Sequence, residues 1–364
     1  MLFFVVMFQL TLCVNRMHAC CSRLFSFESR SAAFDLFESP SNFGCHVLMN
    51  KTLTTLFACT LVFGCSASIV TGNDLVSVNA KNAPNAEAKT SYIVTAPPKS
   101  LKLNAFYKKY VSASGYPVIS SGKVSDYALK EAAYLIDKML VKRPDVRKAM
   151  IDSGSRMIIM AYNEYTTQIP DYHWLKPKAF WDRRARGLGG SERDPVCCSA
   201  EENLLAFKSD PYSKENILIH EFAHNMHLRG MVRVDKTFDA RLKKTYEAAM
   251  QKGLWKGKYA SRNKNEYFAE GVQSWFNNNR INDHDHNHVD TRVELIEYDP
   301  GLAAMCKEVF RDTVFEYTKP TTRLTGHMAG YDPSKAPTFR WPKGSEKIGK
   351  DILKKANERG KEKK

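Results

Sequence analysis

The stretch that decides the fold is "NILIHEFAHNMHLRG", residues 216–230, which carries three histidines and a glutamate. His220 and His224 are four residues apart, so on a helix both imidazoles project from one face on successive turns. Both rings can then reach one zinc ion at about 2.0–2.1 Å, while Glu221, one step round the helix, is placed to touch a zinc-bound water. The preceding "NILI" predicts a buried helix, as a metal site requires. Because HExxH also occurs by chance in unrelated helices, a further ligand is needed.

A third histidine on the same segment does not supply that ligand. In the pattern HExxHxxGxxH the glycine falls where this chain has His227, and the third histidine falls where it has Gly230. His227 follows His220 by seven residues, but three ligands within two turns of one helix give poor tetrahedral geometry. We therefore interpret His227 as a helix-surface residue or a partner of a ligand.

The other source of a ligand is a glutamate on a second helix. "NEYFAE" (265–270) supplies Glu266 and Glu270 one turn apart on one face. One carboxylate would bind the metal, and the other would hydrogen-bond a ligating histidine and fix its tautomer. The alternative is a pair of solvated glutamates. It fits less well because the neighbours Tyr267, Phe268 and Trp275 indicate a buried helix.

Hydrophobic periodicity around these motifs predicts an α+β fold with helices dominating the second half. Apolar residues at helical spacing predict an amphipathic helix after Ser125, and "RMIIMA" predicts a buried strand. "NLLAF" predicts a short edge strand before the histidine helix. The remaining expected elements are three helices, over 237–253, 263–278 and 300–315. This order suits a zincin-like metallopeptidase domain.

"HEFAH" at 220–224, followed by "YASRNKNEYFAE" at 259–270, resembles the catalytic region of the anthrax lethal factor-like gluzincins. Those proteins have HEFGH and later a tyrosine seven residues before EFFAE. The resemblance covers about 50 residues, roughly 217–275. It implies that the zinc ligands are His220, His224 and Glu266. It also implies that Glu221 is the general base, that Tyr259 stabilises the oxyanion, and that Glu270 lies behind the ligands.

The implied activity is hydrolysis of a peptide or protein substrate by an exported zinc metallopeptidase. Glu221 would take a proton from the attacking water, and Tyr259 would donate to the carbonyl oxygen. The chain has no room for the toxin's delivery and docking domains, so the toxin's substrate is not carried over. The alternative is a non-catalytic envelope protein that keeps the fold and the zinc for binding or support. Such a protein has no chemical need for Glu221 or Tyr259.

The N-terminal part indicates export. "MNKTLTTLFACTLVFGC" supplies a charged n-region, an apolar h-region too short to span a bilayer, and small residues at the cleavage point. We interpret 49–65 as a signal peptide and 1–48 as an extended or mis-assigned leader. "VFGC" resembles a lipobox, which would attach a lipid anchor at Cys65; plain cleavage after it is the alternative.

The rest of the chain divides into three expected parts. Residues 66–100 are polar and without periodicity, which predicts a flexible linker. Residues 101–342 are long enough for one catalytic domain. Residues 343–364 are rich in lysine, which predicts a basic tail with at most one frayed helix.

The formal charge of +15 does not indicate nucleic-acid binding. Residues 1–65 carry four basic and three acidic residues, so their removal leaves +14. Outside the tail, basic and acidic residues alternate, and no zinc-finger, helix-turn-helix or RNP pattern occurs. The charge instead predicts a solvated basic surface close to anionic polymers of the envelope.

Three smaller features complete the expectations. The body contains Cys197, Cys198 and Cys306, which permit one disulfide between Cys306 and either of the others. "NDHDHNH" (282–288) is not a known ligand spacing. It predicts a polar loop, with a rim that contacts the active site as the alternative. "WDRRARGLGGSERDPVCC" (181–198) predicts a long lid-like loop.

Overall fold

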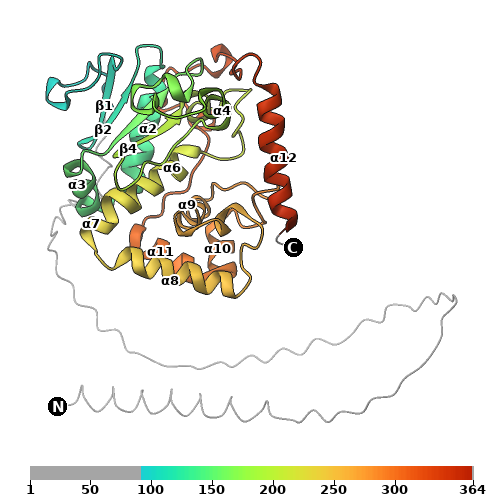
Figure 1. Ribbon diagram of the computed structural model, residues 1–364. Coiled ribbons are helices and arrows are strands. Elements are labelled where there is room, and N and C mark those ends of the chain that lie inside the picture. The colour runs from blue at the N-terminus through green and yellow to red at the C-terminus, as the bar shows by residue number, and fades with distance from the viewer. Residues whose placement is uncertain (1–91, 363–364) are drawn as a thin grey trace, which may run out of the picture. The chain divides into compact units, whose positions relative to one another are not determined.

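The structure, a computed structural model, describes residues 92–362 (Figure 1). The expected leader, the signal segment with Cys65, and most of the expected linker lie outside these residues. No helix within 92–362 is both long and apolar enough to cross a membrane.

A four-stranded sheet forms one half of the described domain. Its strands lie in the order β1-β2-β3-β4, with β1 antiparallel to β2 and the other pairs parallel. Their bounds are β1 Lys109–Ala113, β2 Tyr116–Ser120, β3 Arg156–Met160 and β4 Val196–Ala200.

Helices make up most of the remainder, as the sequence predicts. Their bounds are α2 Asp126–Met139, α3 Pro144–Asp152, α4 Lys178–Arg184, α5 Glu201–Leu204, α6 Ile217–Asn225, α7 Val232–Val234, α8 Phe238–Gln251, α9 Lys264–Trp275, α10 Arg292–Tyr298, α11 Pro300–Phe310 and α12 Glu346–Glu362. A π-helical turn, Met226–Met231, continues α6. The domain is therefore α+β.

The sheet is buried on both faces, which explains why β3 is a continuous apolar run. Met157 and Ile159 point into the larger core, whereas Ile158 and Met160 point into a smaller core on the other face. Successive side chains of a strand alternate between faces, so neither face could be polar here.

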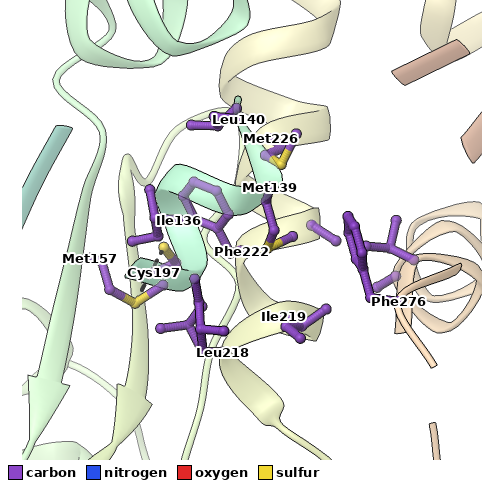
Figure 2. Packing of buried hydrophobic residues seen from close by; sticks show 14 of the residues in the cluster. Ile136, Met139, Leu140, Met157, Cys197, Leu218, Ile219, Phe222, Met226 and Phe276 are labelled. Carbon is purple, nitrogen blue, oxygen red and sulfur yellow. Dashed lines mark hydrogen bonds between the residues drawn. The ribbon is translucent and has the colours of Figure 1, made fainter. Parts of the chain in front are cut away.

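The larger core holds α6 in place. Figure 2 shows Leu218, Ile219 and Phe222 of α6 lying among side chains of α2, β3 and β4. These three residues have no exposed surface. Because one side of α6 is fixed in the core, the direction of its other side, which carries His220 and His224, is fixed too.

The strand predicted over "NLLAF" is wrong. The edge strand is the preceding β4, and 201–204 form a helical turn. Asn203 explains this, because its side chain donates to Asp210 and to the carbonyls of Tyr212 and Glu215 and accepts from the Ile217 N–H. Asn203 thereby ties the loop that follows it to the start of α6, which it could not do if "NLLAF" formed a strand.

The folded part begins earlier than the expected boundary at residue 101. Tyr92 is buried and its hydroxyl donates to Asp137 at 3.1 Å. Thr95 and Tyr110 exchange two backbone hydrogen bonds of 2.9 and 2.8 Å. Residues 92–100, expected in the linker, therefore belong to the domain.

The C-terminal segment is more helical than the expected basic tail. Most of it forms the seventeen-residue helix α12, which packs against α4 (Figure 1). Ala356 is buried and Ile352 is half-buried, while lysines occupy the outer face. The disulfide that the sequence permits is not formed, because Cys197, Cys198 and Cys306 are all buried free thiols.

Candidate active site

His220 and His224 lie on α6 with their ring nitrogens facing each other. The helix begins where the Asn216 side chain accepts from the Leu218 N–H at 3.0 Å. The two Nε2 atoms are 3.2 Å apart. Two atoms each about 2.0–2.1 Å from a tetrahedral ion are separated by about 3.3 Å, so this spacing fits a shared zinc.

Glu266 comes from α9 and completes the group. Asn263 caps that helix by accepting from the Glu266 N–H at 3.0 Å. The Glu266 Oε2 lies 3.1 Å from His220 Nε2 and 3.2 Å from His224 Nε2. Two imidazoles and one carboxylate form a donor set typical of catalytic zinc sites. The structure thus brings together the three expected ligands, from segments more than forty residues apart.

The charges around this group favour a cation. Burial works against ionisation of Glu266, but the two histidines outweigh it and hold the pKa of Glu266 well below its usual range. Burial likewise opposes the charged form of His220, yet Glu266, Glu221 and Glu270 raise its pKa to about 10. A divalent ion would satisfy the same negative field.

The residue that orients His220 is Gln273, which sequence reasoning missed. Its Oε1 lies 2.8 Å from His220 Nδ1, whereas Glu270 Oε1 is 3.5 Å away. The Gln273 amide nitrogen donates to the carboxylate of Glu215 at 2.9 Å. Since that carboxylate only accepts, the Gln273 oxygen must face the imidazole, so Nδ1 donates and Nε2 is left free for a metal. The spacing Glu266, Glu270, Gln273 along one helix face was the available signal.

Glu270 lies behind the histidines, held chiefly by other partners. Its carboxylate is 3.3 Å from His286 Nε2 and accepts from Asn279 at 3.1 Å. Burial alone would lower the pKa of His286, but Glu270 and Asp283 raise it to about 10. His286 belongs to the "NDHDHNH" loop, so the alternative interpretation of that loop, a contact with the active site, describes it better than an outlying polar loop.

Glu221 is half-buried beside the segment 187–190, which was expected to be part of a lid. Leu188 exchanges backbone hydrogen bonds of 3.2 and 2.8 Å with Cys198 of β4, so this segment is a fixed wall. A Cβ on Gly187 would lie 2.8 Å from the Glu221 Cγ, and one on Gly189 would lie 2.5 Å from the His224 ring. Burial raises the pKa of Glu221, an effect that the two histidines oppose.

Tyr259 lies close to Glu266 and within the field of Glu221. Its backbone N–H donates to the Asp285 carbonyl at 2.7 Å, and its hydroxyl lies 3.4 Å from Glu266 Oε1. Burial and Glu266 raise the pKa of Tyr259 above its usual range. The phenol therefore keeps its proton at neutral pH and can donate it in a hydrogen bond.

Two cavities of about 320 and 400 Å³ meet at these side chains. The smaller is also lined by Ile352, Leu353 and Ala356 of α12, and the larger by Phe180 and Trp181 of α4. Both are bordered by a common set of residues: Arg184, Gly187, His220, Glu221 and Tyr259. An extended ligand that fills both cavities must pass these five.

His227 does not take part in this site. It is fully buried, its Nε2 lies 3.0 Å from Asp239 Oδ1, and its ring packs against Phe238 and Phe268. Burial lowers the pKa of His227 to about 4, an effect only partly opposed by Asp239. It is a neutral core residue, and the expectation of a helix-surface position is wrong.

Comparison with known proteins adds little to this geometry. No protein-family model matches the sequence, and no curated protein matches it. The solved structure of the Pro-Pro endopeptidase PPEP-2 from Paenibacillus alvei is similar, at 17% identity and a TM-score of 0.36. That similarity covers 53% of this chain and 97% of the other. Similarity of this degree assigns no family, and the function has to be argued from the site itself.

Proposed function

We propose that this chain is a zinc-dependent metalloendopeptidase of the gluzincin type. The observation that carries the proposal is the convergence of His220 Nε2, His224 Nε2 and a Glu266 oxygen within 3.2 Å of one another, beside the half-buried Glu221. A binding protein would have no chemical need for a carboxylate at that point, whereas hydrolysis needs a general base beside the metal.

The residues of the chain divide the reaction between them. His220, His224 and Glu266 would hold a zinc ion, which would supply a Lewis acid for activating water and polarising a carbonyl. Glu221 would accept a proton from the attacking water as the water oxygen bonds to the carbonyl carbon. The Tyr259 hydroxyl donates a hydrogen bond to the carbonyl oxygen as it gains charge. Glu221 then delivers the proton to the amide nitrogen as the C–N bond breaks.

An extended peptide has a natural place along the wall at 187–190. Leu188 directs its N–H and C=O toward Cys198, so in strand geometry those of Gly187 and Gly189 point to the opposite edge. A substrate strand pairing there would lie across Glu221 and enter both cavities. Such pairing is strand addition, which reads the backbone of the substrate more than its side chains.

A peptide digest tests the function as a whole. We expect the zinc-loaded full chain to cleave members of a mixed peptide library, or crosslinked peptidoglycan peptides, with products identified by mass spectrometry. A chelator should stop cleavage, and added zinc should restore it. Absence of any chelator-sensitive product from both substrate sets would contradict the proposal and favour a binding role.

Replacement of Tyr259 by phenylalanine tests the oxyanion role. Tyr259→Phe keeps the ring and deletes one donor, and loss of one such donor costs about 3 kcal/mol, or roughly a hundredfold in kcat. KM and zinc content should stay near their original values, because the charge on oxygen develops only in the transition state.

Tyr246→Phe is the matched control for the Tyr259 variant. The Tyr246 hydroxyl donates to the Ser261 carbonyl at 2.8 Å, in the same turn as Tyr259, but it borders neither cavity at the site. The Tyr246→Phe variant should therefore leave kcat unchanged. Equal turnover in Tyr259→Phe and the wild-type protein would remove Tyr259 from the mechanism and leave it as a loop anchor.

A further inference from the structure

Arg184 stands at the point where the two cavities meet. It is the last residue of α4, it is partly buried, and it borders both cavities together with Glu221 and Tyr259. Its guanidinium interacts with the Tyr259 phenol and lies within the field of the Glu221 carboxylate. No motif in the sequence drew attention to it.

The neighbouring arginines point elsewhere and have partners. The Arg183 guanidinium stacks 4.1 Å above the Trp341 ring. Arg186 is fully buried and pairs with Glu202 at 2.6 Å. Among residues 92–362, by contrast, no carboxylate oxygen lies within 4 Å of a side-chain nitrogen of Arg184. Because no direct ion pair holds the guanidinium, its N–H groups can donate to an oxygen of an incoming group.

The position of Arg184 indicates which part of a substrate would carry the oxygen that Arg184 binds. A side chain of the substrate would occupy one cavity or the other, whereas the peptide bond to be cut must pass the five residues common to both. At that point negative charge develops on the carbonyl oxygen. A guanidinium only donates, so beside Tyr259 it donates to the phenol oxygen and leaves the phenol proton for an acceptor, either Glu266 Oε1 at 3.4 Å or the carbonyl oxygen.

We propose that Arg184 is a catalytic residue that stabilises the scissile carbonyl oxygen together with Tyr259. The proposal rests on the peptidase function proposed above. The bond changes are those of peptide hydrolysis, and Arg184 contributes hydrogen bonds and positive charge without exchanging a proton. Its guanidinium stays protonated throughout.

The test compares Arg184→Ala and Arg184→Lys with Lys178→Ala in the full chain. Lys178 is the first residue of α4, is exposed and borders neither cavity, so its removal controls for loss of a positive charge from that helix. We expect Arg184→Ala to lower kcat about a hundredfold, the typical loss for one oxyanion donor. KM, zinc content and melting temperature should stay close to the wild-type values. Lysine should restore part of the loss, and Lys178→Ala should behave as wild type.

A second measurement does not depend on turnover. A phosphinic peptide, in which a tetrahedral phosphorus replaces the scissile carbonyl, carries the negative oxygens that Arg184 is proposed to bind. Its Kd should weaken in Arg184→Ala by the same factor as kcat, while the Kd of the product peptide stays unchanged. In the double variant with Tyr259→Phe, the two losses should combine to less than their product, because the residues act on one oxygen.

The outcomes separate this proposal from the function on which it rests. Wild-type cleavage together with an unaffected Arg184→Ala would overturn the role of Arg184 alone. A change confined to KM, and only for peptides with acidic side chains, would also overturn it and make Arg184 a side-chain recognition residue. If the wild-type protein neither cleaves peptides nor binds the phosphinate, both proposals fail together.

Discussion

Glu221→Gln is expected to lower turnover by about two to four orders of magnitude, the usual contribution of a general base. The amide has nearly the same shape as the carboxylate, so it fits the space beside Gly187, where Glu221 is closely packed. It cannot accept a proton from the attacking water. Zinc content and melting temperature should therefore match those of the wild-type protein, and kcat on the best library peptide is the quantity to compare.

Asp285→Asn is the control for the charge that the Glu221 variant removes. Asp285 lines only the smaller cavity, and its carboxylate lies 3.1 Å from His284 Nε2, so it is not one of the five residues common to both cavities. The Asp285→Asn variant should retain most of the wild-type activity. Normal turnover in Glu221→Gln would exclude Glu221 as the base, whereas a loss of zinc would show that it supports the ligands instead.

The second large effect is expected from His224→Ala, which removes one of the three proposed zinc ligands. Loss of an outer-shell partner already weakens metal affinity about 10–100-fold, so loss of a direct ligand should exceed that range and abolish cleavage. Metal analysis after dialysis should find about one zinc per wild-type chain and almost none in the variant. His284→Ala, which removes a histidine from the rim of the smaller cavity, should keep its zinc.

A different result would change the site assignment. Unchanged zinc content in His224→Ala would mean that the ion binds elsewhere. The close approach of His220, His224 and Glu266 would then need another explanation. Loss of zinc in both histidine variants would instead point to a wider ligand set that includes the loop at 282–288.

The elements with strong periodicity could be predicted from the sequence. The helices now seen as α2, α8 and α9 have apolar residues at helical spacing. Two of them also have caps, because Ser125 accepts from the Tyr127 N–H in α2 and Asn263 accepts from the Glu266 N–H in α9. The strand β3 is a short apolar run, which is the pattern of a strand buried on both faces. Local pattern and tertiary packing agree in these segments.

The errors come from segments where long-range contacts decide the structure. "VCCSA" has no alternation, so β4 was overlooked, and the apolar "NLLAF" was preferred although Asn203 is committed to a loop. The lysines of α12 conceal its apolar stripe, which gains stability only by packing on α4. Tyr92 lies in a polar segment and shows its role only through its distant contact with Asp137.

The candidate site shows the same division. His220, His224 and Glu266 stand in motifs whose spacing implies convergence, and the structure brings them together. Arg184 and Gln273 stand in no motif, because each acts through its position in space relative to residues distant in sequence. Glu270 was expected to orient a histidine, but Gln273, one turn further along α9, lies closer to His220.

The close approach of the wall at 187–190 to α6 has a genetic consequence. Every single-nucleotide change that replaces a glycine adds a Cβ, whichever residue results. At Gly187 that atom would meet the Glu221 side chain, and at Gly189 it would meet the His224 ring. No missense change at either codon avoids this contact. Such changes therefore disturb the HExxH helix as directly as changes in the helix itself.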